Sequence, residues 1–413
     1  MASQGVPLAD ASDRRILSAA ACSGGLWVAM AKTVLLTLGR LPKALELARC
    51  LHGAGCKVLV AEPFGLHLTR PSRAVARSFR VTAPNDDPNA YAAELTTIID
   101  TQDVDLVVPI SEEVLHVARV AAGYHGKASF FCPPFKVLHE LHDKAAFIEL
   151  AGRLGLRVPE TARAGTEAAD ALLSRGEAVI KPALGCSGVG LSFVSPQHPP
   201  TDEQLGDGMV VQRRIRGREI STLSLARRGK VLTSVVYDGL VHAGTVAVAF
   251  RRCEDCEAAE AWVAAFVERT GYSGFIAFDI IVDETGAVFP IECNPRLTSG
   301  LHFFDHAHLA AALLNAEPSA PTFKAETTMQ EGHTALAIAY SHILQPKAFV
   351  RRFANVFTTR DVLWSGRDPL PFLMMTPASW PVLQRTLFGG KTLAEAATAD
   401  IEWRPDSPLP PDH

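Results

Sequence analysis

The sequence predicts a chain of mixed α/β and α+β character, in which a parallel-sheet domain comes first and a strand-rich domain follows. Short apolar runs alternate with helical patterns from Thr33 to Cys132, which is typical of a parallel sheet covered by helices. After Pro134, paired strands with glycine-containing turns become common, and a hairpin pattern occupies residues 274–300. The length of 413 residues is enough for two or three domains.

The composition is that of an ordinary globular protein and excludes some functions. Hydrophobic residues make up 48% and charged residues 20% of the chain. A formal net charge of −4 gives no support for nucleic acid or an anionic membrane as a partner. Eight cysteines over this length predict reduced thiols in a cytoplasmic protein. Cys253 and Cys256 form a CxxC without a second pair, which argues against a zinc or redox site.

Residues 1–29 precede the first strand pattern. Arg14 and Arg15 stand before an apolar run, and Ala29-Met30-Ala31 resembles a signal-peptidase site. However, Met30 leads directly into a buried-strand pattern, which favours an extension, or the product of an upstream start codon, over a cleaved signal. Ser, Gly and Lys residues interrupt the run, which makes a poor membrane span.

The first domain is expected to alternate strands with helices. In order, the expected elements are strand 33–38, helix 42–51, strand 57–61, helix 91–100, strand 105–110, helix 114–122 and strand 128–132. Pro42 suits the first turn of a helix. In such sheets ligands bind at the carboxyl ends of the strands, here near Gly39-Arg40 and Ser111-Glu112-Glu113. Ordinary helix capping by these loop residues is the alternative.

Two lysines and a glycine-rich turn follow. Lys144 lies in a largely helical stretch, 136–156, and Lys181 ends a short strand that begins at Ala178. The turn Gly185–Gly190 would let backbone N–H groups approach phosphate oxygens without side-chain clash. It is not a Walker A loop, which needs GxxxxGK[ST] before a helix. A hairpin without a ligand is the alternative.

A second group of strands leads to the hairpin. Met209–Gln212 is followed by Arg213, Ile215 and the Gly217-Arg218-Glu219 sequence. Strands 220–225 and 231–236 are expected to pair across Arg228-Gly229-Lys230, and 257–270 is expected to be a helix with Trp262 and Phe266 on its buried face.

The hairpin carries converging acids. Strand 275–282 turns at 284–286 and returns along 287–292. Because successive strand side chains alternate, Glu292 and Asn294 share one face, with Asp279 on the facing arm. Such oxygen ligands suit Mg²⁺, which prefers few carboxylates plus phosphate oxygens. A polar hairpin face with surface acids is the alternative.

Taken in order, these parts resemble the ATP-grasp superfamily, which includes biotin carboxylase, carbamoyl phosphate synthetase and the D-alanine–D-alanine ligases. The resemblance covers Thr33 to Leu314 and ends in the Glu292-Cys-Asn-Pro-Arg296 motif. It implies a Rossmann-like domain at 30–133 and a two-lobed ATP-grasp domain at 134–320. The α+β extension at 321–405 lies outside the resemblance, and a substrate-side cap and a dimer surface are the alternatives for it. Residues 406–413 read as a disordered tail.

The resemblance also implies roles for particular residues. It implies that ATP is held by Lys144, Lys181, Gly185, Ser187, Gly188, Gly190, Gln212, Arg213, Ile215 and Glu219. Asp279, Glu292 and Asn294 would hold Mg²⁺ or Mn²⁺, and Arg296 and Lys181 would be catalytic. Arg213 departs from the glutamate that is common there, so a side-chain contact at that position is in doubt.

The implied activity is ligation of a small-molecule acid and an amine through an acyl phosphate. Ser299 and His302 follow the metal motif and are the candidates for substrate contact. The short run TSGLHFF is similar to ligases of mycosporine biosynthesis, in which case an enolic oxygen would be phosphorylated. A phosphotransferase and a non-catalytic nucleotide-binding protein are the alternatives, although the intact lysines and acids argue against the latter. A homodimer is left open.

Overall fold

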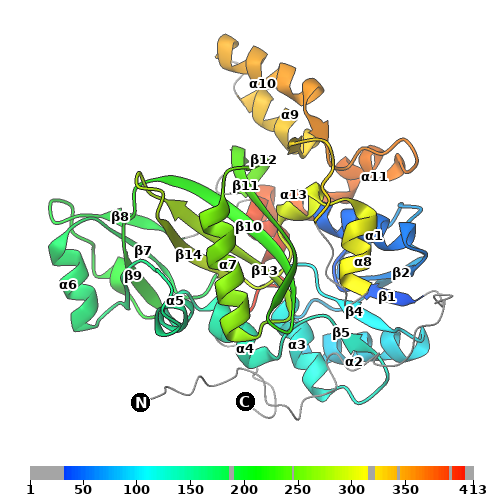
Figure 1. Cartoon of the computed structure of the whole chain (residues 1–413). Coiled ribbons are helices and arrows are strands. Elements are labelled where there is room, and N and C mark those ends of the chain that lie inside the picture. Colours follow the sequence, from blue (N-terminus) through cyan, green and yellow to red (C-terminus); the bar gives the residue numbers. More distant parts are fainter. Residues whose placement is uncertain are drawn as a thin grey trace.

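The computed structural model describes residues 32–185, 190–243, 246–314, 321–341, 345–389 and 393–404. The predictions for residues 1–29, for the tail after residue 405 and for Ser187 and Gly188 lie outside the described residues. The described strands form three sheets, of five, four and seven strands, which are flanked by helices in Figure 1. No helix in these ranges is both long enough and apolar enough to cross a membrane.

The N-terminal sheet is parallel, as predicted, with the order β3-β2-β1-β4-β5. Its strands are β1 (Thr33–Leu36), β2 (Lys57–Glu62), β3 (Arg77–Arg80), β4 (Leu106–Val108) and β5 (Ser129–Phe130), with helices α1 (Pro42–Gly53), α2 (Pro88–Thr101) and α3 (Val114–Gly123). The order reverses between β1 and β4, so the loops after these strands open at the position where doubly wound sheets bind ligands.

The helical stretch around Lys144 is broken. Helix α4 (Phe135–His142) ends at Asp143, and α5 (Lys144–Arg153) begins immediately after it. Asp143 has extended backbone angles, and its carboxylate accepts a hydrogen bond from the N–H of Ala146 at 2.9 Å. The predicted stretch is largely helical, and Asp143 divides it into two helices because it acts as the N-cap of α5. As a result, Lys144 stands at the first position of α5.

The four-stranded sheet is antiparallel, with the order β6-β9-β7-β8. It contains β6 (Thr161–Arg163), β7 (Ala178–Pro182), β8 (Ser192–Val194) and β9 (Met209–Arg213), with helix α6 (Glu167–Arg175) and the short 3₁₀ helix η1 (Glu203–Leu205). Its small core, which includes Leu172, Ile180 and Val211, is separate from the other hydrophobic clusters. This sheet therefore forms a lobe of its own.

The seven-stranded sheet has the order β14-β13-β10-β11-β12-β15-β16. It contains β10 (Arg218–Arg227), β11 (Lys230–Ala243), β12 (Val246–Arg252), β13 (Gly274–Val282), β14 (Val288–Asn294), β15 (Thr328–Gln330) and β16 (Arg360–Asp361). Helix α7 (Glu257–Thr270) packs Trp262 and Phe266 against Phe278 of β13, at ring-centroid distances of 5.2 Å in both cases. The two aromatic residues are core residues, as predicted.

The C-terminal part, from residue 321 onward, contacts both the seven-stranded sheet and the region around the N-terminal sheet. Strand β15 extends the seven-stranded sheet by pairing with β12. The helices that follow the hairpin are η2 (Ser299–Phe303), α8 (His306–Leu314), α9 (Gly332–Ser341), α10 (Pro346–Thr358), α11 (Leu370–Leu373), α12 (Met375–Ala378), α13 (Trp380–Gly389) and α14 (Leu393–Thr398). Helices α9 and α10 project away from the rest of the molecule in Figure 1, whereas α14 returns to the N-terminal sheet.

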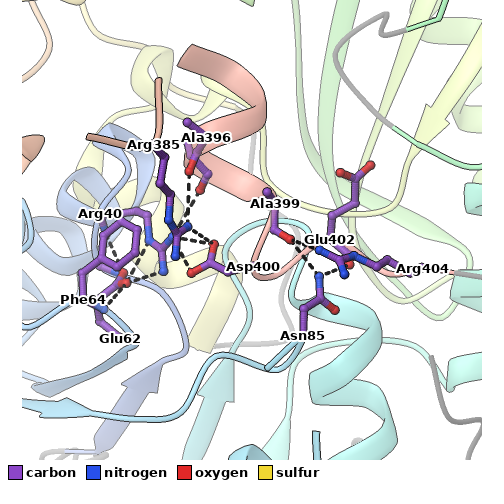
Figure 2. Close-up of polar contacts among 12 residues, drawn as sticks. Arg40, Glu62, Phe64, Asn85, Arg385, Ala396, Ala399, Asp400, Glu402 and Arg404 are labelled. Carbon is purple, nitrogen blue, oxygen red and sulfur yellow. Dashed lines mark hydrogen bonds and ion pairs between the residues drawn. The ribbon is translucent and has the colours of Figure 1, made fainter. Parts of the chain in front are cut away.

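A buried ion cluster fastens residues 393–404 to the N-terminal sheet (Figure 2). The guanidinium of Arg40 donates to Glu62 Oε1 at 2.8 Å and to both carboxylate oxygens of Asp400, at 2.8 and 3.0 Å. It also lies 3.5 Å from the ring centroid of Phe64. Asn85 adds hydrogen bonds to two backbone carbonyls of this segment. The C-terminal segment is thereby anchored across the edge of the first domain.

Candidate active site

A cavity of about 640 Å³ lies where the three sheets meet. It is lined by strand residues of the four- and seven-stranded sheets and by residues that follow β1 and β4. The residues predicted from the sequence that line it are Lys144, Lys181, Gly185, Gln212, Arg213, Ile215, Glu219, Asp279, Glu292, Asn294, Arg296, Ser299 and His302. Gly190 is described but is not part of the lining. The predicted set is therefore largely assembled at one place.

The acidic hairpin forms as the alternation of side chains predicted. Asp279 of β13 is the direct cross-strand partner of Glu292 of β14, and Asn294 lies two residues further along the same strand. Asp279 accepts hydrogen bonds from Ser221 Oγ at 2.6 Å and from Asn294 Nδ2 at 3.1 Å. Burial, and then the neighbouring Glu292 carboxylate, raise the pKa of Asp279 to about 6. Two carboxylates thus share one partly enclosed site.

These residues fit a divalent cation. A bound cation would offset the repulsion that raises the pKa of Asp279. In the described ranges, no group of three or more His, Cys, Asp or Glu side chains is placed to hold a metal ion, but Mg²⁺ bound partly by phosphate oxygens needs only one or two carboxylates. Asn294 turns its amide oxygen toward Arg296 and its nitrogen toward Asp279. Its amide would have to rotate to serve as a third ligand.

The two predicted lysines lie beside the acids. Lys181 is 6% exposed, and its ammonium donates to Gln212 Oε1 at 3.0 Å and to the carbonyl oxygen of Ile291 at 2.8 Å. Burial lowers the pKa of Lys181 to about 8, although Glu292 acts in the opposite direction. Lys144 lies 3.6 Å from Glu292 Oε2 and donates to the carbonyl oxygen of Gly185 at 2.7 Å. Both ammonium groups therefore lie in the same cavity as the acids.

The ends of the glycine-rich turn have the backbone conformation that glycine allows. Gly185 has φ +118° and Gly190 has φ +75°. A Cβ atom at Gly190 would lie only 3.2 Å from Pro182 Cγ. Side chains at both positions would be strained, which explains why the turn is built from glycine at each end.

The residues predicted to contact the adenine and ribose of ATP differ in their exposure and in their hydrogen bonds. Gln212 connects its two neighbouring strands within the four-stranded sheet, because it accepts from Lys181 of β7 and donates to Thr161 Oγ1 of β6 at 2.9 Å. The N–H of Arg213 already donates to the carbonyl oxygen of Glu160 at 2.8 Å, and its exposed side chain lies 3.8 Å from the same glutamate. Glu219 is exposed at the start of β10. The ring of Phe193 lines the cavity although it is 61% exposed, a feature that the sequence did not single out.

The loop after β4 contributes a charged partner for Arg296. Glu112 Oε1 lies 2.5 Å from Arg296 Nη2, which also donates to Asn294 Oδ1 at 2.9 Å. Burial would raise the pKa of Glu112, but Arg296, His142 and Lys43 outweigh it and lower this pKa to about 2. The adjacent Glu113 instead accepts from backbone N–H groups of its own loop. The side chain of Glu112 thus lines the cavity, whereas that of Glu113 stabilises the loop itself.

His302 lines the cavity but is also part of a buried polar cluster. Its Nδ1 lies 3.1 Å from Glu46 Oε2, and its ring stacks on Phe250 at 5.8 Å. Glu46 is further bonded to His306 and Lys324. Burial lowers the pKa of His302, so its neutral form is favoured despite the nearby carboxylate. Ser299 opens η2 beside it.

Several residues that line the cavity were not predicted from the sequence. Lys43 donates to Ser111 Oγ at 3.1 Å and to the carbonyl oxygen of Leu297 at 2.7 Å. Glu331, at the end of β15, and Thr398 of α14 also line the cavity. Lys43 follows Pro42, the first residue of α1, in the segment that comes after β1. Because ligands bind near the carboxyl ends of parallel strands, this position was a signal for Lys43 in the sequence. The other two come from a region without a recognised motif.

The unpaired CxxC carries no metal-site geometry. Cys253 Sγ accepts a hydrogen bond from Arg218 Nη2 at 2.8 Å, and burial raises its pKa to about 12. Both cysteines of this motif are free thiols. A thiol with so high a pKa is a poor nucleophile and a poor metal ligand at neutral pH.

Comparisons with known proteins agree with this geometry. The family model of an ATP-grasp domain matches residues 141–300. A comparison with curated protein sequences finds no match.

Solved structures share the fold at low sequence identity. The biotin carboxylase domain of 2-oxoglutarate carboxylase from Hydrogenobacter thermophilus, in complex with MgADP, ADP and bicarbonate, has a TM-score of 0.57 and 16% identity, with 70% of each chain covered. N5-carboxyaminoimidazole synthetase from Staphylococcus aureus, complexed with ADP, has a TM-score of 0.55 and 14% identity, with 70% of this chain and 78% of that one covered. L-amino acid ligase from Bacillus licheniformis has a TM-score of 0.53 and 18% identity, with 70% of this chain and 75% of that one covered.

The family match spans both lysines, the glycine-rich turn and the acidic hairpin, and the structural likeness covers 70% of this chain. Together with the cavity between the four- and seven-stranded sheets, these findings identify the central part of this chain, residues 141–300, as an ATP-grasp domain.

Proposed function

We propose that this protein is an ATP-dependent ligase that phosphorylates a carboxylate or enol oxygen and joins the activated carbon to an amine, with release of ADP and phosphate. The observation that carries the proposal is the pairing of Asp279 with Glu292 across two strands, with the ammonium groups of Lys144 and Lys181 beside them in one cavity. This arrangement suits Mg²⁺-bound triphosphate.

The nucleotide would lie between the four- and seven-stranded sheets. Lys144 and Lys181 would neutralise phosphate oxygens, and the backbone of the glycine-rich turn would cover them. The adenine would meet the backbone at Arg213 and Ile215 and the apolar face of Phe193, and Glu219 would receive the ribose hydroxyls. Asp279 and Glu292 would hold Mg²⁺, which when bound neutralises charge that develops on the transferred phosphoryl group.

The remaining steps fall to residues nearer the N-terminal sheet. Arg296 is held by Glu112 and Asn294, and its guanidinium would stabilise the negative charge on the transferred phosphoryl group or on the intermediate. Because phosphoryl transfer depends mainly on positioning and charge neutralisation, this set needs no protein nucleophile. A closed cavity would also protect an acyl phosphate from water.

The relatives support the reaction type through their printed names. A biotin carboxylase domain, a carboxyaminoimidazole synthetase and an amino acid ligase share this fold, and two of them are complexes with ADP. Carboxylic acids and amines are therefore the first substrate classes to test.

The direct test measures ADP and phosphate release from the purified protein with Mg-ATP and panels of carboxylic acids and amines. We expect release only when an acid and an amine are both present. A stable phosphorylated product without an amine would favour a phosphotransferase. Tight ATP binding without any hydrolysis would favour a non-catalytic nucleotide-binding protein.

A further inference from the structure

The C-terminal part of the chain supplies an acid to the cavity. Glu331 follows β15 and precedes α9, and it lines the cavity together with the predicted site residues. Its backbone is fixed on both sides, because its N–H donates to the carbonyl oxygen of Val248 at 2.8 Å and its own carbonyl accepts from Ala335 at 2.9 Å. It lies outside the residues that match the ATP-grasp family model. The acid is thus held firmly at a position specific to this C-terminal part.

The carboxylate of Glu331 lacks a strong partner. Within the described ranges, its hydrogen bond is a long one, from Thr334 Oγ1 at 3.5 Å. By contrast, the nearby Asp361 accepts from the N–H groups of Gly332, Leu363 and Trp364 at 2.6 to 2.9 Å. A largely enclosed carboxylate without such bonds is costly, and a cationic ligand would remove that cost.

The groups that face Glu331 come from three elements. Burial, and then Asp361 of β16, raise the pKa of Glu331 to about 7, whereas Thr334 of α9 and Lys43 of α1 act in the opposite direction. Glu331 is therefore poised to exchange a proton near neutral pH.

A chain of polar contacts places Glu331 relative to the acidic hairpin. Arg296 bonds to both Asn294 and Glu112. Lys43 interacts electrostatically with Glu112 and with Glu331. Arg296 and Lys43 thus connect the acidic hairpin to Glu331 through Glu112, and all of these residues line the same cavity. An anionic acyl group suits the space near the two cations, and a cation suits the space at Glu331.

We infer that Glu331 binds the ammonium group of the amine substrate and takes the proton that its nitrogen must lose before it attacks the activated acid. The inference rests on the proposed function and names its second substrate as a protonated amine, in preference to water, an alcohol or a thiol.

The proposed step balances as follows. One proton passes from the ammonium to the Glu331 carboxylate, and the freed nitrogen lone pair forms a C–N bond to the acyl carbon. The bond between this carbon and the phosphate oxygen breaks. The departing phosphate takes a second proton from the nitrogen and leaves as hydrogen phosphate, while Glu331 returns its proton to solvent.

The test compares Glu331→Gln with the wild type, using the acid and amine found in the screen and hydroxylamine as a substitute nucleophile. Hydroxylamine is uncharged at neutral pH and needs no ammonium site. We expect Glu331→Gln to lower the kcat/KM for the amine by at least about 100-fold relative to the rate with hydroxylamine, the range of a lost general base. Glu326→Gln is the matched control, because Glu326 is 44% exposed and its nearest cationic partner, Arg360, is 3.9 Å away. It should leave both rates as in the wild type.

The pH dependence is a second readout. Because Glu331 must be ionised, the wild-type kcat/KM for the amine should fall as the pH drops below about 7, and this limb should be absent in Glu331→Gln. Equal loss of the amine and hydroxylamine rates, or a limb that persists in the variant, would overturn the inference alone. Absence of acid-dependent ADP release in the wild type with hydroxylamine would overturn the proposed function and the inference together.

Discussion

The anchor between Arg40 and Asp400 allows a quantitative prediction for Asp400→Asn. The two side chains are 2% and 5% exposed, so the substitution removes one charge from a buried ion pair. Loss of one partner from such a pair costs about 3–5 kcal/mol. Arg40 keeps Glu62 as a partner, and asparagine keeps one acceptor oxygen, so the lower value of about 3 kcal/mol applies.

This cost should appear as local opening of residues 393–404. Since about 1.4 kcal/mol corresponds to a tenfold change in an equilibrium constant, the open population of this segment should rise about 100-fold. Hydrogen exchange of the amides of Ala399, Ile401 and Glu402 measures it directly, because all three donate within this segment. Thr398 lines the cavity, so substrate-dependent ADP release should fall in the same variant.

Arg385→Gln is the graded control. Arg385 also contacts Asp400, at 3.2 Å, but its side chain is 35% exposed, and ion pairs of this kind contribute about 0–1 kcal/mol. Exchange should therefore rise by less than about tenfold in this variant. If Asp400→Asn exchanged no faster than Arg385→Gln, the segment would be held by something other than the buried charges.

Three further predictions concern the cavity and its support. Glu292→Ala should abolish ADP formation while the circular dichroism spectrum stays unchanged; wild-type turnover would remove the metal assignment. Lys181→Met should weaken ATP binding at least tenfold, about 1.4 kcal/mol, in titration calorimetry, and an unchanged Kd would place Lys181 outside the nucleotide site. Lys324, His302 and His306 hold the pKa of Glu46 well below its ordinary value against the effect of burial, so its stabilising contribution is present above about pH 4.3, the value of an unfolded glutamate, and is lost as the pH falls further. Glu46→Gln should therefore lower Tm clearly at pH 7 and much less at pH 3, and a difference that stays constant with pH would contradict this.

The sequence was most informative where the alternation of side chains along a strand and the chemistry of those side chains indicate the same site. Alternation along a strand was enough to bring Asp279 and Glu292 together, because cross-strand register follows from the hairpin. The repeated strand-helix pattern likewise predicted a parallel sheet with the loop of Ser111 and Glu112 at its ligand-binding edge, although it did not give the strand order. By contrast, β3 was missed because Arg77-Ser-Phe-Arg80 has too few apolar residues to be recognised as a strand.

Residues brought in from distant parts of the chain could not be predicted. Glu331 reaches the cavity only because β15 joins the edge of a sheet formed much earlier in the sequence. Glu46 looked like an ordinary helix residue, yet tertiary packing buries it against His302 and Lys324. No local pattern records such contacts, because burial of a carboxylate depends on partners supplied by the complete fold.

Strand β15 has a consequence for how substrates of different size could be accepted. The acids of β13 and β14 stand at one side of the seven-stranded sheet, and Glu331 directly follows β15 near the other. Backbone hydrogen bonds between all the intervening strands make their separation nearly constant. A longer or shorter carboxylic acid substrate must then be accommodated by side chains of η2 and α14. Selection for new substrates would therefore change those side chains and leave the sheet unchanged.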